Sequence, residues 1–220
     1  MSGERAIWQT FSRQTGAVLV DNFEEFLDTT ALFLHFSEGI GRRVAVVGGG
    51  GSVGVAASDI CEQVRLQIPA SPPDIQQQLR ALLPPAGTSI RNPIDVGAPM
   101  LPPSLFQKVL EILLSWDGID ALIIDRIYFY GAQQLSGMSR EDSEKRVEVM
   151  LDMRRKFKKP FLAILGELTT DVDNIDIETE RRRVQDRFLR NGIAVLPSLQ
   201  RAVRAFSNIC SYYEKVYTLK

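Results

Sequence analysis

The chain has 220 residues, enough for one large domain with a complete hydrophobic core and too few for two such domains. Its 26 basic and 27 acidic residues leave a formal net charge of −1, so no overall field attracts nucleic acid or anionic lipid, and we expect neither as a partner. The N-terminal residues lack a signal-peptide core and no apolar run is long enough to span a bilayer, so a cytoplasmic location is expected. Cys61 and Cys210 fall in predicted helices and are expected to be buried thiols.

Strand-like and helix-like patterns alternate along the chain, which is typical of an α/β fold with a mostly parallel sheet and helices on both faces, in three layers. Apolar runs predict strands at Ala17–Val20, Arg43–Val47, Leu66–Ile68, Pro93–Val96, Ala121–Asp125, Phe161–Leu165 and Ala194–Leu196. Apolar periodicity predicts helices over 22–36, 104–116, 139–158 and 199–217. We assign 1–220 to a single domain, with 1–16 as a lead-in from a preceding domain if the full protein has one.

Helix starts are indicated by capping residues. Asp21 or Asn22 opens the helix over 22–36, and Ser139 opens the helix over 139–158. Ser71, followed by two prolines and Asp74, predicts a further helix with Ser71 at the N-cap. The helix over 104–116 is apolar around most of its circumference, so it either lies deep in the sheet packing or meets a second subunit, as in a homodimer.

The segment from Val44 to Asp59 runs from an apolar strand through four consecutive glycines into a helix. Glycine lets backbone N–H groups approach a ligand, and the free N–H groups at a helix N-terminus favour an anion, so the turn is a candidate phosphate site. The candidate residues are Gly49, Gly50, Gly51, Ser52, Val53 and Gly54. The spacing also matches the dinucleotide-binding pattern, but no carboxylate ends the next strand over 66–69, which disfavours a nicotinamide cofactor. The alternative is a glycine turn that only packs tightly.

Four segments, in order, resemble the flavodoxin-like succinyl-CoA ligase domain of the NDP-forming acyl-CoA synthetases, a family that includes ADP-forming acetyl-CoA synthetase and is related to succinyl-CoA synthetase. They are Phe11–Phe26, Val44–Asp59, Leu83–Asp95 (Leu-Pro-Pro-Ala-Gly-Thr-Ser-Ile-Arg-Asn-Pro-Ile-Asp) and Asn191–Ala205. The third segment is the most specific. Family members usually carry Gly-Gly-Pro-Gly where this chain has Gly51-Ser52-Val53-Gly54, so the turn keeps its outer glycines and gains two side chains.

The resemblance implies a ligase that works with further domains. Such synthetases pass phosphate through a histidine in a His-Thr-Gly segment of a CoA-binding domain, and they use an ATP-grasp domain or subunit. CoA, ADP or ATP, and phosphate are therefore implied for the complete enzyme, with none assigned to this chain. The His-Thr-Gly segment is not present here, and the single histidine, His35, stands among Phe and Leu as a packing residue would. We assign no catalytic residue and do not expect the chain to be active alone.

Two further groups of polar residues give weaker signals of a site. Asn92 and Asp95 form a possible second loop of the site, although Asn92 before a proline is equally consistent with a structural turn. Asp171, Asp173 and Asp176 lack the glycine and final glutamate of a calcium loop, so we predict no metal site and interpret them as a solvated loop.

Three hypotheses of function remain. The first is a domain or subunit of an NDP-forming acyl-CoA synthetase, an acid–thiol ligase, in which the glycine turn and the following helix N-terminus stabilise phosphate or phosphohistidine from a partner domain. The second is a noncatalytic α/β interaction module that kept the fold without phosphate chemistry. The third is an independent nucleotide or flavin binder, which the missing ribose carboxylate disfavours.

Overall fold

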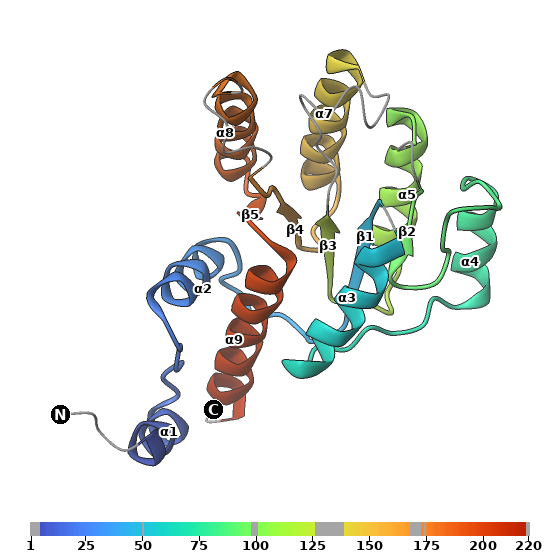
Figure 1. Ribbon diagram of the computed structural model, residues 1–220. Coiled ribbons are helices and arrows are strands. Elements are labelled where there is room, and N and C mark those ends of the chain that lie inside the picture. The colour runs from blue at the N-terminus through green and yellow to red at the C-terminus, as the bar shows by residue number, and fades with distance from the viewer. Residues whose placement is uncertain are drawn as a thin grey trace.

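The computed structural model describes residues 5–49, 51–97, 101–125, 139–167, 173 and 175–218, with only the backbone of 51–53 and 217–218. In these ranges five parallel strands form one sheet in the order β2–β1–β3–β4–β5 (Figure 1). This is the strand order of flavodoxin-like folds, so the predicted architecture is confirmed. The strands are β1 (Val44–Gly48), β2 (Ile94–Asp95), β3 (Ala121–Asp125), β4 (Phe161–Ile164) and β5 (Ala194–Leu196).

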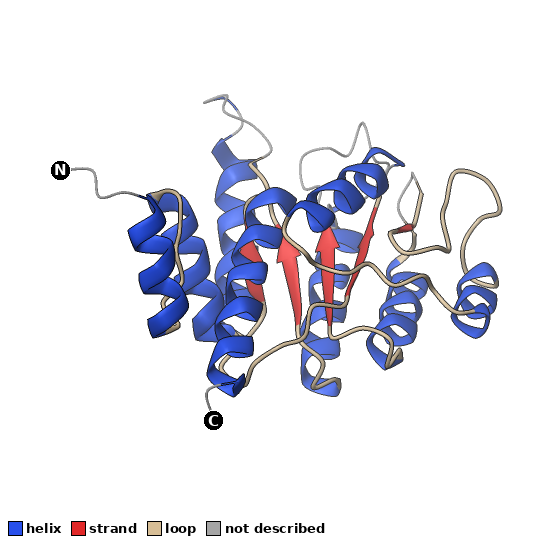
Figure 2. Cartoon of the chain, turned by 90° about the horizontal axis from the view of Figure 1, so that it is seen from below, coloured by secondary structure: helices blue, strands red, loops and turns tan. Residues whose placement is uncertain are grey.

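Helices cover both faces of the sheet (Figures 1 and 2). One face packs against α4 (Pro73–Arg80), α5 (Pro103–Ser115), α7 (Arg140–Lys156) and α8 (Ile175–Arg190). The other face packs against α2 (Phe23–His35), α3 (Gly51–Gln63) and α9 (Leu199–Thr218). The remaining helix, α1 (Arg5–Thr15), lies away from the sheet beside α9, where Lys215 Nζ donates to Ser12 Oγ at 3.3 Å.

The alternation of side chains along the strands divides the core into two apolar clusters. Along β1, Val44 and Val46 face the layer of α2, α3 and α9, whereas Ala45 and Val47 face the layer of α4, α5, α7 and α8. All five residues of β1 are buried, as are all five of β3. Burial on both faces explains why these strands appear in the sequence as continuous apolar runs.

Burial within the chain accounts for the apolar circumference of α5. The helix lies between α4 and α7 against the sheet, and Phe106, Val109, Leu110, Leu113 and Leu114 are buried there. Leu105 and Ile112, beside this buried face, are partly buried against the same cluster. Of the two alternatives raised by the sequence, deep packing is the one observed, and α5 needs no second subunit to cover it.

Two of the three predicted side-chain caps are present. The Asn22 side chain accepts a hydrogen bond from Glu25 N at 2.9 Å, and Ser139 Oγ accepts one from Asp142 N at 3.0 Å. The Ser71 cap is wrong, because α4 starts at Pro73 and its N-cap is Pro72, without a side-chain cap. Ser71 therefore stands one position too early to reach the free N–H groups.

Three predicted strands are absent or shorter than predicted. Ala17–Val20 forms no strand but connects α1 to α2, with Leu19 41% exposed; a short apolar run does not by itself provide a neighbouring strand. Leu66–Ile68 is reduced to a single parallel bridge between Gln67 and Arg43, because the Asn92 side chain occupies the next pairing positions along β1. The last predicted strand before β3, Pro93–Val96, is present as the two residues of β2.

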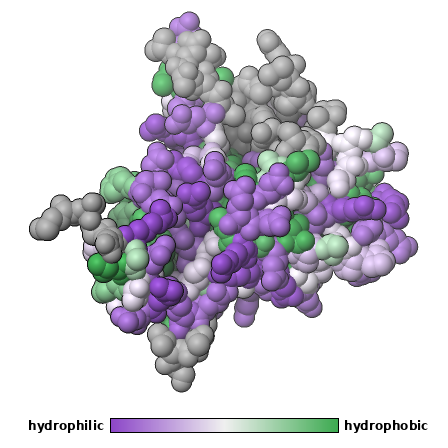
Figure 3. All heavy atoms as spheres, turned by 60° about the horizontal axis from the view of Figure 1, so that its bottom comes forward, coloured by the Kyte–Doolittle hydropathy of each residue, from purple (hydrophilic) through white to green (hydrophobic). Residues whose placement is uncertain are grey.

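Exposed apolar side chains gather on the outer helices α1 and α2. Figure 3 shows a largely hydrophilic face, with one group of apolar side chains at its left end and another near its middle. The most exposed large apolar residues of these helices are Ile7, Trp8, Phe11, Phe23, Phe26, Leu27 and Leu34. Among the described residues, none of the helices combines the length and the apolar character that a membrane crossing requires.

Candidate functional site

The carboxyl edge of the sheet contains the topological switch point of the fold. From β1 the chain passes to β2 on one side, while β3 lies on the other side of β1. In open α/β sheets of this kind, ligands bind in the crevice outside the carboxyl ends of the strands at such a point. Here the ends of β1 and β3 are Gly48 and Asp125, and the predicted glycine turn follows directly after Gly48.

Gly48 is required by the packing of the sheet. A Cβ atom added to Gly48 would lie 2.9 Å from the backbone oxygen of Asp125, closer than a carbon and a carbonyl oxygen can approach. A side chain at this position would therefore push apart the carboxyl ends of β1 and β3. The first glycine of the run is explained by the fold and needs no ligand.

Gly54 has no such packing reason. Among the described residues, a Cβ atom added to Gly54 would meet only Pro93 Cβ, at 3.9 Å, which is ordinary van der Waals contact. Glycine inside a helix costs about 0.5–1 kcal/mol relative to alanine, so the fold would be at least as stable with alanine here. A glycine that the packing does not need favours the interpretation that something must approach the backbone at the start of α3.

The start of α3 is suited to an anion. Helix α3 begins at Gly51, so the backbone of Ser52 and Val53 lies in its first turn, where N–H groups have no partner within the helix. That turn carries no acidic residue, unlike the first turns of α7 and α8, so its own side chains do not neutralise the positive end of the dipole. Gly49 connects the strand to this turn, and Gly50 lies outside the described residues.

Asn92 serves the fold. Its side chain Oδ1 accepts from Val46 N at 3.0 Å, and its Nδ2 donates to Val44 O at 2.9 Å and to Pro69 O at 3.1 Å. The side chain thus takes the place of a peptide group beside the part of β1 that β2 is too short to cover. Of the two interpretations of Asn92, the structure supports the structural one.

Asp95 lies closer to the glycine turn. It stands opposite Gly48 in the register of β1 and β2, and Val96 N donates to Gly48 O at 2.9 Å. Its Oδ1 accepts from Gly97 N at 2.8 Å, and its backbone pairs with Ser89 in both directions. The loop is therefore held beside Gly48, and the Asp95 carboxylate is engaged within the loop.

A third residue at this edge, Asp125, was not predicted from the sequence as part of the site. Asp125 is only 6% exposed and ends β3 next to Gly48. Its signal in the sequence is an acid directly after the apolar run over 121–124, at a carboxyl strand end. Its own Cβ would lie 3.4 Å from a Cβ atom added to Gly48, so Asp125 borders the switch point.

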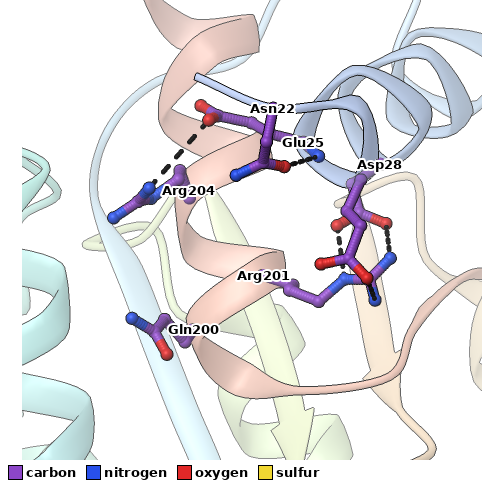
Figure 4. A pocket seen from close by; sticks show the side chains of 7 residues that line it. Asn22, Glu25, Asp28, Gln200, Arg201 and Arg204 are labelled. Carbon is purple, nitrogen blue, oxygen red and sulfur yellow. Dashed lines mark hydrogen bonds and ion pairs between the residues drawn. The ribbon is translucent and has the colours of Figure 1, made fainter. Parts of the chain in front are cut away.

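A cavity of about 210 Å³ lies between the first turns of α2 and α9 (Figure 4), lined by Asn22, Glu24, Glu25, Asp28, Gln200, Arg201 and Arg204. Arg201 donates to both oxygens of Asp28, at 2.7 and 2.8 Å, and this contact raises the pKa of the guanidinium. Arg204 Nη1 lies 3.9 Å from Glu25 Oε2. The charged groups of this cavity are paired with one another. We therefore interpret them as ion pairs that hold α2 against α9.

Other predicted features are not part of the site. His35 ends α2, half-buried, and its Nδ1 lies 3.0 Å from Ala31 O, as expected of a packing residue. Within the described ranges no three His, Cys, Asp or Glu side chains gather closely enough to hold a metal ion. Asp176 lies in the first turn of α8, so its assignment to a loop is wrong, whereas Asp171 lies outside the described residues.

The comparisons with known proteins agree with the resemblance drawn from the sequence. The chain is 26% identical over 178 residues to the 4-hydroxybutyrate–CoA ligase (ADP-forming) of Nitrosopumilus maritimus, a match that covers 80% of this chain and 24% of that relative. It is 32% identical over 124 residues to a trans-feruloyl-CoA synthase of an unknown prokaryotic organism, covering 56% of this chain and 17% of that relative. The chain thus spans about a quarter or less of these relatives.

The fold is also that of a solved synthetase. The acetyl-coenzyme A synthetase 1 of Ca. Korarchaeum cryptofilum superposes with a TM-score of 0.73 at 19% identity, covering all of this chain and 44% of that one. The model of the Ligase-CoA domain matches residues 44–182, which include the glycine turn, the second loop and strands β1 to β4. The chain therefore belongs to the Ligase-CoA domain family.

Proposed function

We propose that this chain is the ligase domain or subunit of an ADP-forming acyl-CoA synthetase, and that the start of α3 binds the phosphate, or phosphohistidine, that a partner domain presents. The observation that carries the proposal is Gly54, a glycine at the start of α3 that the packing leaves without a structural reason. A side chain there would obstruct an anion approaching the free N–H groups of the first turn.

The relatives support the same chemistry. The two curated relatives are named as a CoA ligase and a feruloyl-CoA synthase, and the acetyl-coenzyme A synthetase was also solved in complex with phosphate and ADP. The chain corresponds to part of each, so the histidine that carries phosphate, the ATP-grasp domain and the acyl substrate are proposed to come from outside it. We expect no acyl-CoA formation from the chain alone, with or without His35→Ala.

The competing function is an interaction module without phosphate chemistry. It is favoured by Ser52 and Val53, which stand where the family carries glycine and proline. The two functions differ in one measurable property, the binding of inorganic phosphate at the start of α3.

The test is a titration of the 15N-labelled chain with inorganic phosphate, followed by amide chemical shifts. A single anion at a helix N-terminus gains on the order of 0.3–2 kcal/mol from the dipole, so we expect weak, millimolar binding with shifts concentrated at residues 49–55. Gly54→Ala is expected to abolish these shifts while keeping or raising the melting temperature. Glu62→Gln, at an exposed position in the last turn of α3, is the matched control and should bind as the wild type does.

The outcomes separate the two functions. Saturable shifts at 49–55 that Gly54→Ala removes, in a variant that melts at or above the wild-type temperature, support the phosphate site. Amides over 49–55 that stay unchanged in phosphate, or a Gly54→Ala variant with unchanged affinity, would remove the ligand role of the turn and leave the interaction module.

A further inference from the structure

A buried arginine lies between α5 and α7. Arg146 is only 2% exposed and heads the fully buried side chains of the described residues by volume. Its guanidinium carbon lies 5.0 Å from the centre of the Phe106 ring on α5, in a cation–π contact. The cation is thus held inside the helix layer by an aromatic face.

This guanidinium lacks the partners that buried arginines normally have. Its Nε and Nη1 have no hydrogen-bond acceptor in the part of the chain that the structure describes, and no carboxylate there lies within 4.0 Å of it. Asp142, one turn earlier on α7, attracts the charge without forming an ion pair, and its carboxylate accepts instead from Ser139 Oγ at 2.9 Å. Leaving two buried donors unpaired is costly, so an acceptor is expected.

The charge is present at neutral pH. Burial lowers the pKa of Arg146 to about 10, which still leaves the guanidinium protonated at pH 7. The position also favours a ligand. Phe106 is the fourth residue of α5 and Arg146 the seventh of α7, so both lie within about 9 Å of helix starts at the carboxyl edge of the sheet.

We propose that Arg146 binds an oxyanion, a carboxylate or phosphate group of a small ligand that enters between α5 and α7 from the carboxyl edge. Phe106 covers one face of the Arg146 guanidinium. The N–H groups of a guanidinium lie in its plane, where they match the geometry of carboxylate and phosphate oxygens. The site is independent of the proposed phosphate site, because α7 and α3 lie on opposite faces of the sheet.

The Nε–H resonance of Arg146 reports on this site directly. We would titrate the 15N-labelled wild-type chain with sodium acetate and, separately, with sodium phosphate, using sodium chloride at equal ionic strength as the reference. The expected result is a saturable shift of the Arg146 Nε–H with acetate or phosphate beyond that with chloride. The acetate and phosphate arms distinguish a carboxylate ligand from a phosphate ligand.

Two variants complete the test. Arg146→Met is expected to weaken binding of the active anion about tenfold or more, because it removes charge-assisted hydrogen bonds. The matched control is Arg155→Met on the same helix, since Arg155 is exposed and already paired with Asp152, and it should bind as the wild type does. An Arg146 Nε–H that moves in neither anion beyond chloride, or an Arg146→Met variant with wild-type affinity, overturns the proposal. If Arg146→Met does not fold, the wild-type titration decides.

Discussion

Asn92→Ala is expected to be among the most destabilising changes near the glycine turn, although Asn92 is only half-buried. The substitution removes three hydrogen bonds of 2.9–3.1 Å and leaves the N–H of Val46 and the carbonyl of Val44 unpaired beside a fully buried strand. At about 0.5–1.5 kcal/mol for each hydrogen bond, the loss amounts to about 2–4 kcal/mol. For a chain of this size, that corresponds to a fall in melting temperature of about 5–15 °C.

Urea denaturation followed by circular dichroism measures this loss, with Asn191→Ala as the control. Asn191 is exposed and donates a single side-chain hydrogen bond, to Arg187 O, so its replacement should cost less than about 1 kcal/mol. The reasoning is refuted if the two variants have the same free energy of unfolding within about 0.5 kcal/mol.

Asn92→Asp sharpens the test, because aspartate has nearly the same shape. It keeps an acceptor for Val46 N but turns a carboxylate oxygen toward Val44 O and Pro69 O. Repulsion from these carbonyls should raise the folded-state pKa of the new carboxyl above its unfolded value. The variant should therefore be most destabilised above the folded pKa and should recover stability as the pH falls and protonation restores one donor.

Three further predictions concern other parts of the chain. Arg201→Met should lower the free energy of unfolding by about 2–3 kcal/mol in urea denaturation, because it leaves the buried Asp28 carboxylate unpaired. Asp28→Asn should lower it by less. If neither variant is less stable than the wild type, the ion pair does not stabilise the contact between α2 and α9. The hydrogen bond from Arg181 lowers the pKa of Glu178 to about 2, so the ionised carboxylate stabilises the fold fully above its unfolded pKa of about 4.3 and no longer does so as the pH falls toward about 2. In Glu178→Gln the free energy of unfolding should therefore fall by up to about 1 kcal/mol less than in the wild type over this pH range. The same fall in both proteins between pH 6 and 3 would argue against this role of Glu178. Burial raises the pKa of both Cys61 and Cys210 to about 12, so a thiol reagent at pH 8 should label the folded chain slowly. In urea both cysteines should be labelled rapidly. Rapid labelling of the folded chain would show that the thiols are exposed.

The strands of the sheet were predictable where burial is two-sided. Continuous apolar runs located β1, β3, β4 and β5 to within a residue or so, because a parallel strand between two helix layers needs apolar side chains on both faces. The same type of run at Ala17–Val20 forms no strand, since an apolar tetrapeptide specifies burial without specifying a pairing partner. The apolar runs did not predict the order of the strands in the sheet; the resemblance gave only a flavodoxin-like fold.

The candidate site was predictable only in part. Four glycines before a helix predict a turn whose backbone N–H groups an anion could approach. The different roles of Gly48 and Gly54 depend on which atoms a side chain at each position would meet, and the sequence does not contain that information. Gly48 faces the backbone of a strand 77 positions further on in the sequence, and Asn92 pairs with groups 46 and 48 positions earlier. Arg146 resembles any helical arginine in the sequence, and only the packing of α5 over it reveals a buried charge.

The shortness of the two outer strands has a consequence for self-association. In the described part of the chain the sheet ends at β2, of two residues, and at β5, of three, and these present few free N–H and C=O groups to a neighbouring molecule. The Asn92 side chain and the antiparallel bridge between Ser89 and Asp95 occupy further groups along the β2 side. An exposed strand edge is a template for pairing with another molecule, and little of it is free here. A concentrated solution of the chain should therefore resist edge-to-edge polymerisation, even though its outer helices expose apolar side chains.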